Sequence, residues 1–367
     1  MKRLLCIIDS LNVGGAETFL MKVMRNLTPE EYQFDFIVSK DGGVYEKEVL
    51  SRGGKIYTVP PRRTNLFRAL KEIRTIVKQN QYRYVLRVGD EPIVCVDLLA
   101  AKFGGAGHLA FRSCNALTGL SKKARMINSL MRPILNAVTD AKIAPSLLAA
   151  EFTFGKKQAK KAYILHNGVD LRLFYYDSCG RDAVRNEFSL QGKFVVGHIG
   201  RFNKQKNHRY LLEVFSEICR MRSDAVLLLV GTGEEQDKIL GWIKDFALED
   251  RVVLAGQRFD IPEILSAMDV FVFPSLHEGM PNTVIEAQAT GLPCVIADTI
   301  TPDADITGLV KYLSLTSTVS EWAETVLEVA RRHRRDTSED FRKHGYDIES
   351  VAKEFVFLMG MSNEVSE

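Results

Sequence analysis

Two carboxylates at a fixed spacing are the clearest candidates for chemistry in this sequence. Glu278 follows a buried apolar run that ends at Phe273. Glu286 comes eight residues later, on the first turns of a helix that we expect to begin near Asn282, a favourable N-cap residue. Each carboxylate can accept hydrogen bonds from a pair of hydroxyl groups, so the two could hold different parts of one elongated ligand. Taken alone, Glu286 could equally be a capping or surface carboxylate.

The backbone between these carboxylates can also bind a ligand. At the N-terminus of the expected helix, amide groups and the helix dipole favour a sugar or phosphate oxygen. The residues at this position are Gly279, Met280, Pro281 and Asn282.

Basic residues follow an earlier expected strand, Phe194–Ile199. This strand delivers Arg201 to the carboxyl edge of its sheet, and we expect Lys206 to open the next helix. A bidentate guanidinium and a compact ammonium at such an edge suit a pyrophosphate. The alternative is a solvated basic loop, in which a carboxylate could neutralise either cation.

A glycine pair follows the first expected strand, Leu4–Ile8. Gly14 and Gly15 lie at a strand-to-helix turn, where backbone amides can approach an anion, although the glycines could simply make a tight turn. The dinucleotide fingerprint GxGxxG is absent here, and it also fails after Gly231, where Gln236 occupies the place of the third glycine. A nicotinamide-dependent dehydrogenase is therefore disfavoured.

The elements that position these residues alternate along the chain. Short apolar runs are separated by amphipathic segments with apolar residues three and four apart, which is the pattern of a parallel sheet flanked by helices. In the first half the expected strands are Leu4–Ile8, Phe34–Val38, Ile56–Val59, Tyr84–Val88, His108–Phe111 and Ala162–Leu165. In the second half they are Phe194–Ile199, Ala225–Val230, Val252–Leu254, Val270–Phe273 and Pro293–Ile296.

This alternation predicts an α/β protein with two doubly wound, Rossmann-like parallel-sheet domains. We expect the first at residues 1–165 and the second at 166–345, with a segment 346–367 whose helix, Ile348–Met359, crosses back to the first domain. Ligands of such sheets bind at the carboxyl ends of the strands. The expected site is therefore a central cleft that the two domains face.

Composition narrows the functional class. With 367 residues, 46% of them hydrophobic and 26% charged, the chain is typical of a soluble globular protein, and its net charge of +3 gives no indication of a nucleic-acid partner. No stretch approaches the roughly 18 apolar residues of a membrane span. The six cysteines are scattered, which favours reduced thiols in a cytoplasmic protein, and the seven histidines show no metal-ligand spacing.

Taken together, these motifs resemble the retaining GT-B glycosyltransferases of family 4, in particular bacterial enzymes of exopolysaccharide and capsule synthesis. The stretch EGMPNTVIE, from Glu278 to Glu286, is similar to the E-x7-E motif of that family. The glycine pair, the Arg201/Lys206 motif and Gly231-x-Gly233 follow in the family's order, and the resemblance spans nearly the whole chain.

The resemblance implies a role for each candidate residue of the second domain. Arg201 and Lys206 would hold the diphosphate of a nucleotide-sugar donor, and Glu278 would contact the hydroxyls of the transferred sugar. Glu286 would take the ribose hydroxyls. The backbone near Gln257 and Arg258 would recognise the base.

The resemblance further implies a contact from the first domain and no metal or other cofactor. Gly14 and Gly15 would approach the donor phosphate. Departure of a nucleoside diphosphate builds negative charge, which fixed cations and helix N-termini can stabilise without a metal. A metal site of the DxD type would require Asp303 and Asp305, which we expect to lie in a polar turn.

Three residues of the first domain depart from the family pattern. Arg87, Arg112 and Cys114 stand where the family often carries histidines. We expect donor binding to be unaffected by these differences, and we assign no catalytic histidine.

Basic residues cluster beside an apolar helical series in the first domain. The apolar residues are Met126, Ile127, Leu130, Met131, Ile134 and Leu135, and the basic ones are Lys122, Lys123, Arg125, Lys156, Lys157, Lys160 and Lys161. Helical apolar spacing most often indicates core packing. The alternative is a partly apolar surface that contacts an anionic membrane, where a lipid-linked acceptor would wait. Another cluster, Arg331–Arg335, is expected to complement the C-terminus of a helix at Trp322–Ala330.

The predicted function is transfer of a hexose, with retention of configuration, from a nucleotide-diphosphate sugar to a glycan or lipid-linked acceptor. We expect the nucleotide to be UDP and the enzyme to act in the cytoplasm, in contact with the inner face of the plasma membrane. One alternative is a nucleotide-sugar epimerase on the same fold, which would need further acid/base residues. The other is a catalytically silent sugar-nucleotide binder, which the intact carboxylates and cations disfavour.

Overall fold

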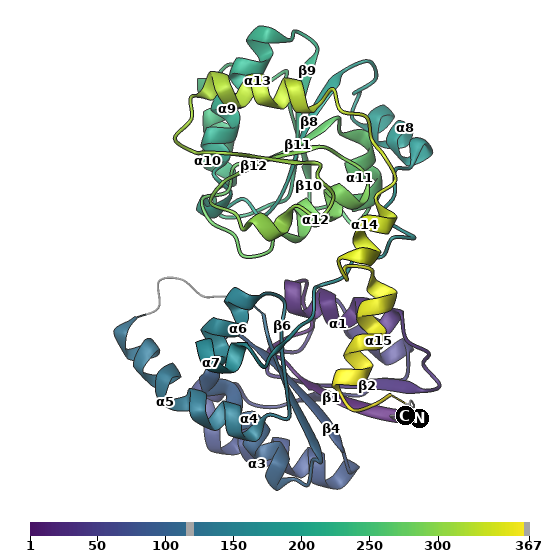
Figure 1. Cartoon of the computed structure of the whole chain (residues 1–367), viewed down its shortest axis with the longest axis vertical. Coiled ribbons are helices and arrows are strands. Elements are labelled where there is room, and N and C mark those ends of the chain that lie inside the picture. Colours follow the sequence, from purple (N-terminus) through teal and green to yellow (C-terminus); the bar gives the residue numbers. More distant parts are fainter. Residues whose placement is uncertain (115–120, 363–367) are drawn as a thin grey trace. The chain divides into compact units, whose positions relative to one another are not determined.

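The computed structural model describes residues 1–114 and 121–362, and these form two compact units (Figure 1). The first unit comprises Met1–Gly168 together with the segment from Gly345 on, and the second comprises Val169–His344. Each unit is built on one sheet of parallel strands flanked by helices, which confirms the predicted fold class of two doubly wound α/β domains.

The sheet of the first unit has seven strands in the order β3-β2-β1-β4-β5-β6-β7. The strand order reverses between β1 and β4, which pair with each other in parallel, and the carboxyl ends of these two strands mark the topological switch point of this unit. The strands are β1 Lys2–Ile7, β2 Tyr32–Val38, β3 Ile56–Thr58, β4 Tyr84–Gly89, β5 His108–Ser113, β6 Ala141–Ala144 and β7 Tyr163–Ile164.

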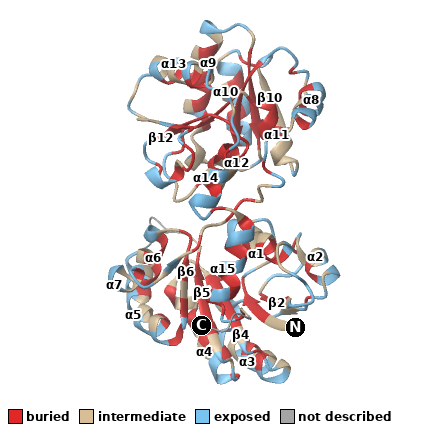
Figure 2. Ribbon diagram, turned by 45° about the vertical axis from the view of Figure 1, so that its right-hand side comes forward, coloured by how far each residue is buried: buried red, intermediate tan, exposed pale blue. Residues whose placement is uncertain are grey.

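Helices of the first unit cover this sheet. They are α1 Gly15–Arg25, α2 Glu46–Ser51, α3 Arg62–Asn80, the 3-10 helix η1 Pro92–Cys95, α4 Val96–Phe103, α5 Lys122–Val138, α6 Leu147–Phe154, α7 Lys156–Ala159 and α15 Ile348–Leu358. In both units the inner strands are largely buried, the edge strands β3, β7, β10 and β13 are mostly half-buried, and exposed residues lie mainly on the helices and loops around the sheets (Figure 2).

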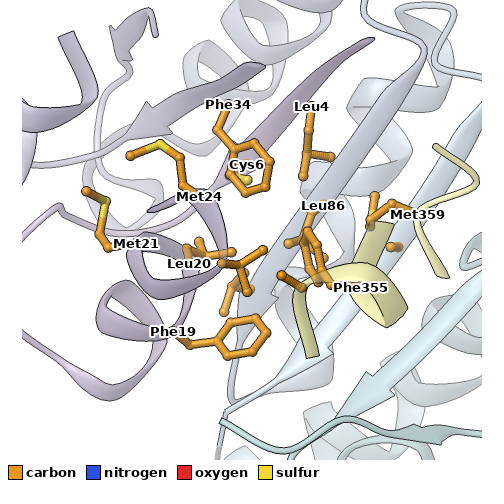
Figure 3. Close-up of a cluster of buried hydrophobic side chains, with 14 of the residues drawn as sticks. Leu4, Cys6, Phe19, Leu20, Met21, Met24, Phe34, Leu86, Phe355 and Met359 are labelled. Atoms are coloured by element: carbon orange, nitrogen blue, oxygen red, sulfur yellow. The ribbon is translucent and has the colours of Figure 1, made fainter. Parts of the chain in front are cut away.

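Helix α15 contributes to the core of the first unit although it follows the second unit in sequence (Figure 3). The ring of Phe355 lies edge-on to Phe19 of α1, with centroids 5.8 Å apart, and 6.0 Å from the ring of Phe34 in β2. Met359 is fully buried in the same cluster. The last helix is therefore an integral part of the first hydrophobic core.

The sheet of the second unit has six strands in the order β10-β9-β8-β11-β12-β13. Its order reverses between β8 and β11, where Val270 pairs with Val196 in parallel register. The strands are β8 Phe194–Ile199, β9 Ala225–Val230, β10 Val252–Gly256, β11 Val270–Phe273, β12 Cys294–Ala297 and β13 Val310–Leu313. The predictions for β8, β9 and β11 are confirmed to the residue.

The second unit has its own set of helices. They are α8 Ser178–Glu187, the 3-10 helix η2 Lys204–Lys206, α9 His208–Met221, α10 Gln236–Asp245, α11 Ile261–Ala267, α12 Asn282–Ala289, the 3-10 helix η3 Pro302–Ala304, α13 Val319–Val329 and α14 Ser338–Lys343. Among the described residues, no helix combines the length and apolar character that a membrane crossing requires.

Two packing predictions need correction. The apolar series of α5 faces the core only in part: Leu135 is buried in it and Met131 packs against it, whereas Met126, Leu130 and Ile134 are exposed. In the cluster Arg331–Arg335, the guanidinium of Arg334 does not complement the end of its neighbouring helix. It donates hydrogen bonds to carbonyl oxygens of other segments, at Thr290, Leu265 and Met268, and so ties those segments together.

Candidate functional site

The loops at the switch point of the second unit bring the main candidate residues together. Strands β8 and β11 are adjacent, so the loops that follow them, at residues 200–207 and 274–281, leave the sheet at the same edge. The strand residues that precede these loops are almost completely buried. The sheet therefore provides a fixed base for both loops.

Lys206 and Glu278 form an ion pair between these loops. Lys206 Nζ lies 2.6 Å from Glu278 Oε1, and the two side chains are 15% and 12% exposed. The same ammonium lies 4.4 Å from the centroid of the Phe273 ring at the end of β11. A charge-assisted hydrogen bond between side chains that are largely shielded from water is stronger than one between fully exposed side chains. The pair therefore places one cation and one carboxylate at a defined point on the sheet edge.

Local folding differs from the prediction around Lys206. The residue ends the 3-10 turn η2 and does not open α9, which begins at His208. Asn203 caps this turn, since its side-chain oxygen accepts a hydrogen bond from the amide of Lys206 across 3.2 Å. Asn207 follows in the left-handed region, with φ of 56°, and this lets the chain change direction between the turn and the helix.

Three further hydrogen bonds join the two loops. The side-chain amide of Gln205 donates to the carbonyl oxygen of His277, and the Gln205 carbonyl accepts from the amide of Leu276, both across 2.8 Å. The side chain of Asn207 donates to the carbonyl oxygen of Pro274 across 3.2 Å. We call these three bonds, together with the Lys206–Glu278 pair, the loop latch.

The backbone of Glu278 is held from its other side as well. Glu278 forms an isolated parallel bridge with Ile300, which follows β12. The carboxylate is thus fixed by its own backbone and by its cation. Sequence reasoning identified both Lys206 and Glu278 as site residues, and the structure brings them together.

Arg201 occupies a different position from Lys206. Its side chain is 71% exposed, and its guanidinium pairs with Glu234, with 3.0 Å between Nη2 and Oε2. Gly231 and Gly233 allow the loop after β9, which carries Glu234, to approach the loop after β8, which carries Arg201. A Cβ on Gly231 would lie 2.0 Å from the carbonyl oxygen of Gly200, and one on Gly233 would lie 2.3 Å from that of Phe202. Arg201 and Lys206 are thus each paired with a carboxylate, as expected for the alternative in which carboxylates neutralise the basic loop.

Helix α12 carries the second predicted carboxylate. It begins at Asn282, and Pro281 occupies the N-cap position, so the prediction that Asn282 caps this helix is wrong. Pro281 has no N–H, so the backbone amides at this end of the helix are those of Gly279, Met280 and Asn282. Glu286 lies one turn into the helix and is half-buried. It belongs to the same loop-and-helix segment as Glu278.

Two buried histidines behind Lys206 were not predicted. His198 Nδ1 donates to the carbonyl oxygen of Val272 across 2.9 Å, and the ring of His198 lies 5.0 Å from that of His208. Burial, with a further contribution from the neighbouring positive charges, lowers the pKa of His198 far below its usual value and that of His208 to about 4. Both rings are therefore neutral at physiological pH. Their position in an apolar strand and at a helix start gave no signal that separated them from core residues.

The residues predicted to recognise a base follow β10. Gln257 is exposed, and Arg258 forms a bidentate pair with Glu187 and another with Asp260. The side chain of Arg258 is therefore held in place by two carboxylates. Only its backbone remains for the predicted role.

The glycine pair lies in the first unit. Gly14 is the N-cap residue of α1 in an extended conformation, and Gly15 is the first residue of that helix. Glu17 in the same turn is half-buried. Burial raises the pKa of Glu17, and the charges of Asp9 and Asp90 add to this effect.

The two arginines that replace expected histidines are structural in different ways. Arg87 is almost fully buried at the end of β4 and pairs with the buried carboxylate of Asp97 across 2.7 Å. Arg112 is 1% exposed, lies 3.6 Å from the centroid of the Phe19 ring, and donates to Asn167 Oδ1 across 2.6 Å. Burial lowers the pKa of Arg112 to about 10.

Cys114 takes the remaining position of an expected histidine. Burial and nearby carboxylates raise the pKa of this thiol to about 12. It is therefore protonated at physiological pH and would be a poor nucleophile.

No metal centre is formed by the part of the chain that the structure describes, where no group of three or more His, Cys, Asp and Glu side chains is suitably arranged. The DxD carboxylates are engaged locally. Asp305 accepts a hydrogen bond from the amide of Gly308 across 2.8 Å, and Asp303 lies within the 3-10 turn η3.

Comparison with known proteins identifies related sequences. Residues 193–332 match the family model described as "Glycosyl transferases group 1". EpsF of Bacillus subtilis, a protein classed as a glycosyltransferase, is 31% identical over 374 residues, which cover 99% of this chain and 97% of EpsF. The UDP-Gal:alpha-D-GlcNAc-diphosphoundecaprenol alpha-1,3-galactosyltransferase of Escherichia coli is 39% identical over 142 residues, covering 38% of this chain and 37% of that enzyme.

Solved structures share the fold along the whole chain. The crystal structure of Anabaena HepE in complex with UDP superimposes with a TM-score of 0.73 at 19% identity, covering 98% of this chain and 97% of HepE. WaaG, a glycosyltransferase involved in lipopolysaccharide biosynthesis, gives a TM-score of 0.73 at 12% identity, covering 97% of this chain and 99% of WaaG.

Proposed function

Because this chain belongs to the group 1 glycosyl transferases, a family of GT-B enzymes, we propose that it transfers a sugar from a UDP-sugar to a lipid-linked glycan with retention of anomeric configuration. The observation that carries this proposal is the loop latch. It fixes Lys206 and Glu278 at the carboxyl edge of the second sheet, directly before the N-terminus of α12.

The loop latch and helix α12 would bind two parts of the donor, its diphosphate and its two sugar rings. Lys206 and the amides at the start of α12 would hold the diphosphate, with Arg201 as a second, more exposed cation. Glu278 would accept hydrogen bonds from the transferred sugar, and Glu286 from the ribose. Gln257 and Arg258 would meet the base through their backbone, and the contact of Gly14 and Gly15 with the donor phosphate stays a prediction.

The leaving group sets the main chemical requirement. As the bond to the sugar breaks, negative charge grows on the β-phosphate, and preorganised donors that face this charge lower the barrier. Lys206 is already oriented by Glu278 and by the Phe273 ring, so little reorganisation is needed at that moment. We propose that these groups act without a metal and that the acceptor attacks on the face that the leaving group vacates.

The choice of nucleotide and acceptor is supported by the related proteins. The name of the Escherichia coli relative specifies a UDP-sugar donor and an undecaprenol-diphosphate acceptor. A Campylobacter jejuni relative, 27% identical over 211 residues, is likewise named for an undecaprenol-diphosphate acceptor. The apolar chain of such an acceptor holds it in a bilayer, and we propose that the enzyme works at the inner face of the plasma membrane in exopolysaccharide or capsule synthesis.

Nucleotide binding provides the first test. We expect UDP and one or more UDP-sugars to raise the melting temperature, whereas 5′-nucleotides of other bases raise it less, because a ligand that binds only the folded state stabilises it by mass action. Slow hydrolysis of the preferred UDP-sugar, followed by NMR, should release the sugar first as the anomer of the donor, and EDTA should leave the rate unchanged. Inversion, or conversion of the donor to an epimer without acceptor, would contradict the proposal.

A further inference from the structure

Buried polar atoms without a hydrogen bond gather next to the Lys206–Glu278 pair. In the part of the second unit that the structure describes, the buried side-chain nitrogen and oxygen atoms of this kind belong to His198, His208 and Ser275. His198 lies one residue before the end of β8, His208 is the first residue of α9, and Ser275 follows β11. Buried polar atoms are nearly always hydrogen-bonded, so a group of exceptions at one place needs a physical reason.

The hydrogen bond of His198 fixes the tautomer of its ring. Nδ1 lies 2.9 Å from the carbonyl oxygen of Val272 in β11, and a carbonyl oxygen can only accept, so Nδ1 carries the hydrogen. The ring is neutral, because burial lowers the pKa of His198 far below its usual value. Nε2 is therefore the unprotonated nitrogen, and its lone pair is the electron-rich end of the imidazole.

Gly200 allows this lone pair to lie beside the side chain of Lys206. His198 and Gly200 are two residues apart at the end of β8, so they lie on the same face of the sheet. A Cβ on Gly200 would lie 3.4 Å from His198 Nε2 and 3.1 Å from Lys206 Cε. Because glycine has no Cβ, Nε2 and the end of the lysine side chain border the same small space.

Aromatic rings also border this space. The fully buried ring of His198 stacks on Phe273 with centroids 5.3 Å apart, and the Lys206 ammonium lies 4.4 Å from the centroid of the same Phe273 ring. His208, which is 2% exposed, stands edge-on to His198 with centroids 5.0 Å apart. In a setting of low dielectric constant, a dipole whose negative end faces an ammonium stabilises the charge more than it would in water.

We propose that His198 is a positioning residue for the donor diphosphate: its Nε2 lone pair faces the ammonium of Lys206 from inside the protein and fixes that ammonium at the carboxyl edge of the sheet. Glu278 acts on the same ammonium from the loop after β11. When sugar hydroxyls engage Glu278, His198 is the acceptor that continues to orient Lys206 toward the phosphates. The inference rests on the proposed role of Lys206 in donor binding.

The competing interpretation is a structural histidine whose role ends with the hydrogen bond to Val272. The two interpretations differ in which ring nitrogen matters, and three substitutions separate them. Asparagine places its amide where the imidazole has Nδ1, so it keeps a donor for Val272. Glutamine places its amide where the imidazole has Nε2, so it keeps an acceptor beside Lys206. Phenylalanine keeps a ring and neither polar group.

Affinity for UDP, measured by calorimetry, tests the proposal. We expect His198→Gln to bind UDP within about 3-fold of the wild type, and His198→Asn and His198→Phe to bind it about 10-fold more weakly. Affinity for UMP should change much less in all three variants, because UMP lacks the β-phosphate. If His198→Asn binds UDP as tightly as His198→Gln, or if UMP and UDP lose affinity equally, the proposal is overturned.

Stability measured in urea gives an independent readout of the same variants. His198→Asn keeps the hydrogen bond to Val272 and should be more stable than His198→Gln, which leaves that carbonyl oxygen without its donor. The order of stability is therefore expected to be the reverse of the order of UDP affinity. A structural histidine predicts the same order for both quantities, and that result would overturn the proposal.

A double-mutant cycle tests whether His198 acts through Lys206. Lys206→Met removes the ammonium, so adding His198→Asn to it should cause no further loss of UDP affinity. A second loss as large as the first shows an independent role and overturns the proposal. His108→Asn is the matched control, since its ring also bonds to a carbonyl oxygen, that of Leu358 across 3.1 Å, but lies in the first unit. It should leave UDP affinity unchanged in either background.

Nitrogen-15 NMR of histidine-labelled protein tests the tautomer without a donor. At neutral pH the ring of His198 should carry its hydrogen on Nδ1 and none on Nε2. A hydrogen on Nε2 overturns the inference, whatever the affinity for UDP. Wild-type UDP affinity in Lys206→Met contradicts the proposed function of this site, whereas a loss in Lys206→Met without one in His198→Asn contradicts this inference alone.

Discussion

The side-chain amide of Gln205 donates to the carbonyl oxygen of His277 across 2.8 Å, and this bond joins two loops that are 72 residues apart in sequence. Neither group belongs to the predicted site, but the bond lies next to the Lys206–Glu278 pair. Gln205 is therefore expected to act through the position of Glu278. Gln205→Ala should weaken UDP-sugar binding by about 5-fold, the equivalent of one net hydrogen bond.

Gln205→Glu gives the sharper comparison, because it keeps the size of the side chain but places an oxygen against the carbonyl of His277. We expect at least the same loss of affinity by calorimetry. Gln236→Ala, at an exposed glutamine of α10, should be neutral. Wild-type affinity in both Gln205 variants would show that the latch does not position the site.

Lys206 should affect stability and activity in separable ways. Lys206→Ala leaves the 12% exposed carboxylate of Glu278 without its cation, which should cost about 1–3 kcal/mol in the free energy of unfolding and lower kcat on the order of 10²-fold. The double variant Lys206→Met/Glu278→Gln removes both charges and should regain part of the stability. Recovery of activity in the double variant would remove Lys206 from the proposed mechanism.

Glu234 is expected to compete with the donor for Arg201. The pair is largely exposed, so its contribution to stability is small. Glu234→Gln frees the guanidinium and removes a negative charge near the proposed diphosphate site, so UDP should bind about 2-fold to 3-fold more tightly at low salt. A matched change at another carboxylate that pairs with an arginine, the half-buried Glu213 beside Arg209, should leave UDP affinity unchanged in the variant Glu213→Gln.

Glu286 should determine the preference for a ribose over a deoxyribose. The wild type is expected to bind UDP more tightly than 2′-deoxy-UDP, because a carboxylate loses a hydrogen bond when the hydroxyl is missing. Glu286→Gln should weaken UDP binding and reduce this preference. If the ratio of the two dissociation constants stays at its wild-type value, the ribose assignment is wrong.

His208 should make folding stability depend on pH. The unfolded histidine binds a proton near pH 6.5, whereas the folded one, with a pKa of about 4, does not, so the unfolded state gains protons first as the pH falls. Stability is therefore full above about pH 6.5 and decreases between about pH 6.5 and 4, by about 2 kcal/mol for this residue at pH 5. Urea titrations at pH 7 and pH 5 measure the change. His208→Gln should reduce it, and His344→Gln, at an exposed histidine, should not.

The positions of most strands could be predicted from the periodicity of apolar residues in the sequence. Strands β8, β9 and β11 are buried on both faces and appear as unbroken apolar runs, so their limits were predicted correctly. Strands β6 and β13 were missed because each has four residues interrupted by a lysine, Lys142 or Lys311. Such short runs are recognised only through their neighbours in the sheet.

Less of the candidate site could be predicted from the sequence. Lys206 and Glu278 were identified by residue type and by their place after strands, but their pairing depends on the order of β8 and β11 in space. The orientation of α5 could not be predicted either. Asn128 and Arg132 of this helix are held against the first unit by hydrogen bonds to Glu91 and to a carbonyl group of α6, and the helix sequence does not contain these partners.

The return of α15 to the first core has a consequence for biosynthesis. Residues Val169–His344 form a continuous unit and can fold as soon as they leave the ribosome, whereas the first unit must wait for Phe355 and its neighbours. Until then the apolar surface around Phe19 and Phe34 stays open to chaperones and proteases. The unit that is translated first is thus completed last.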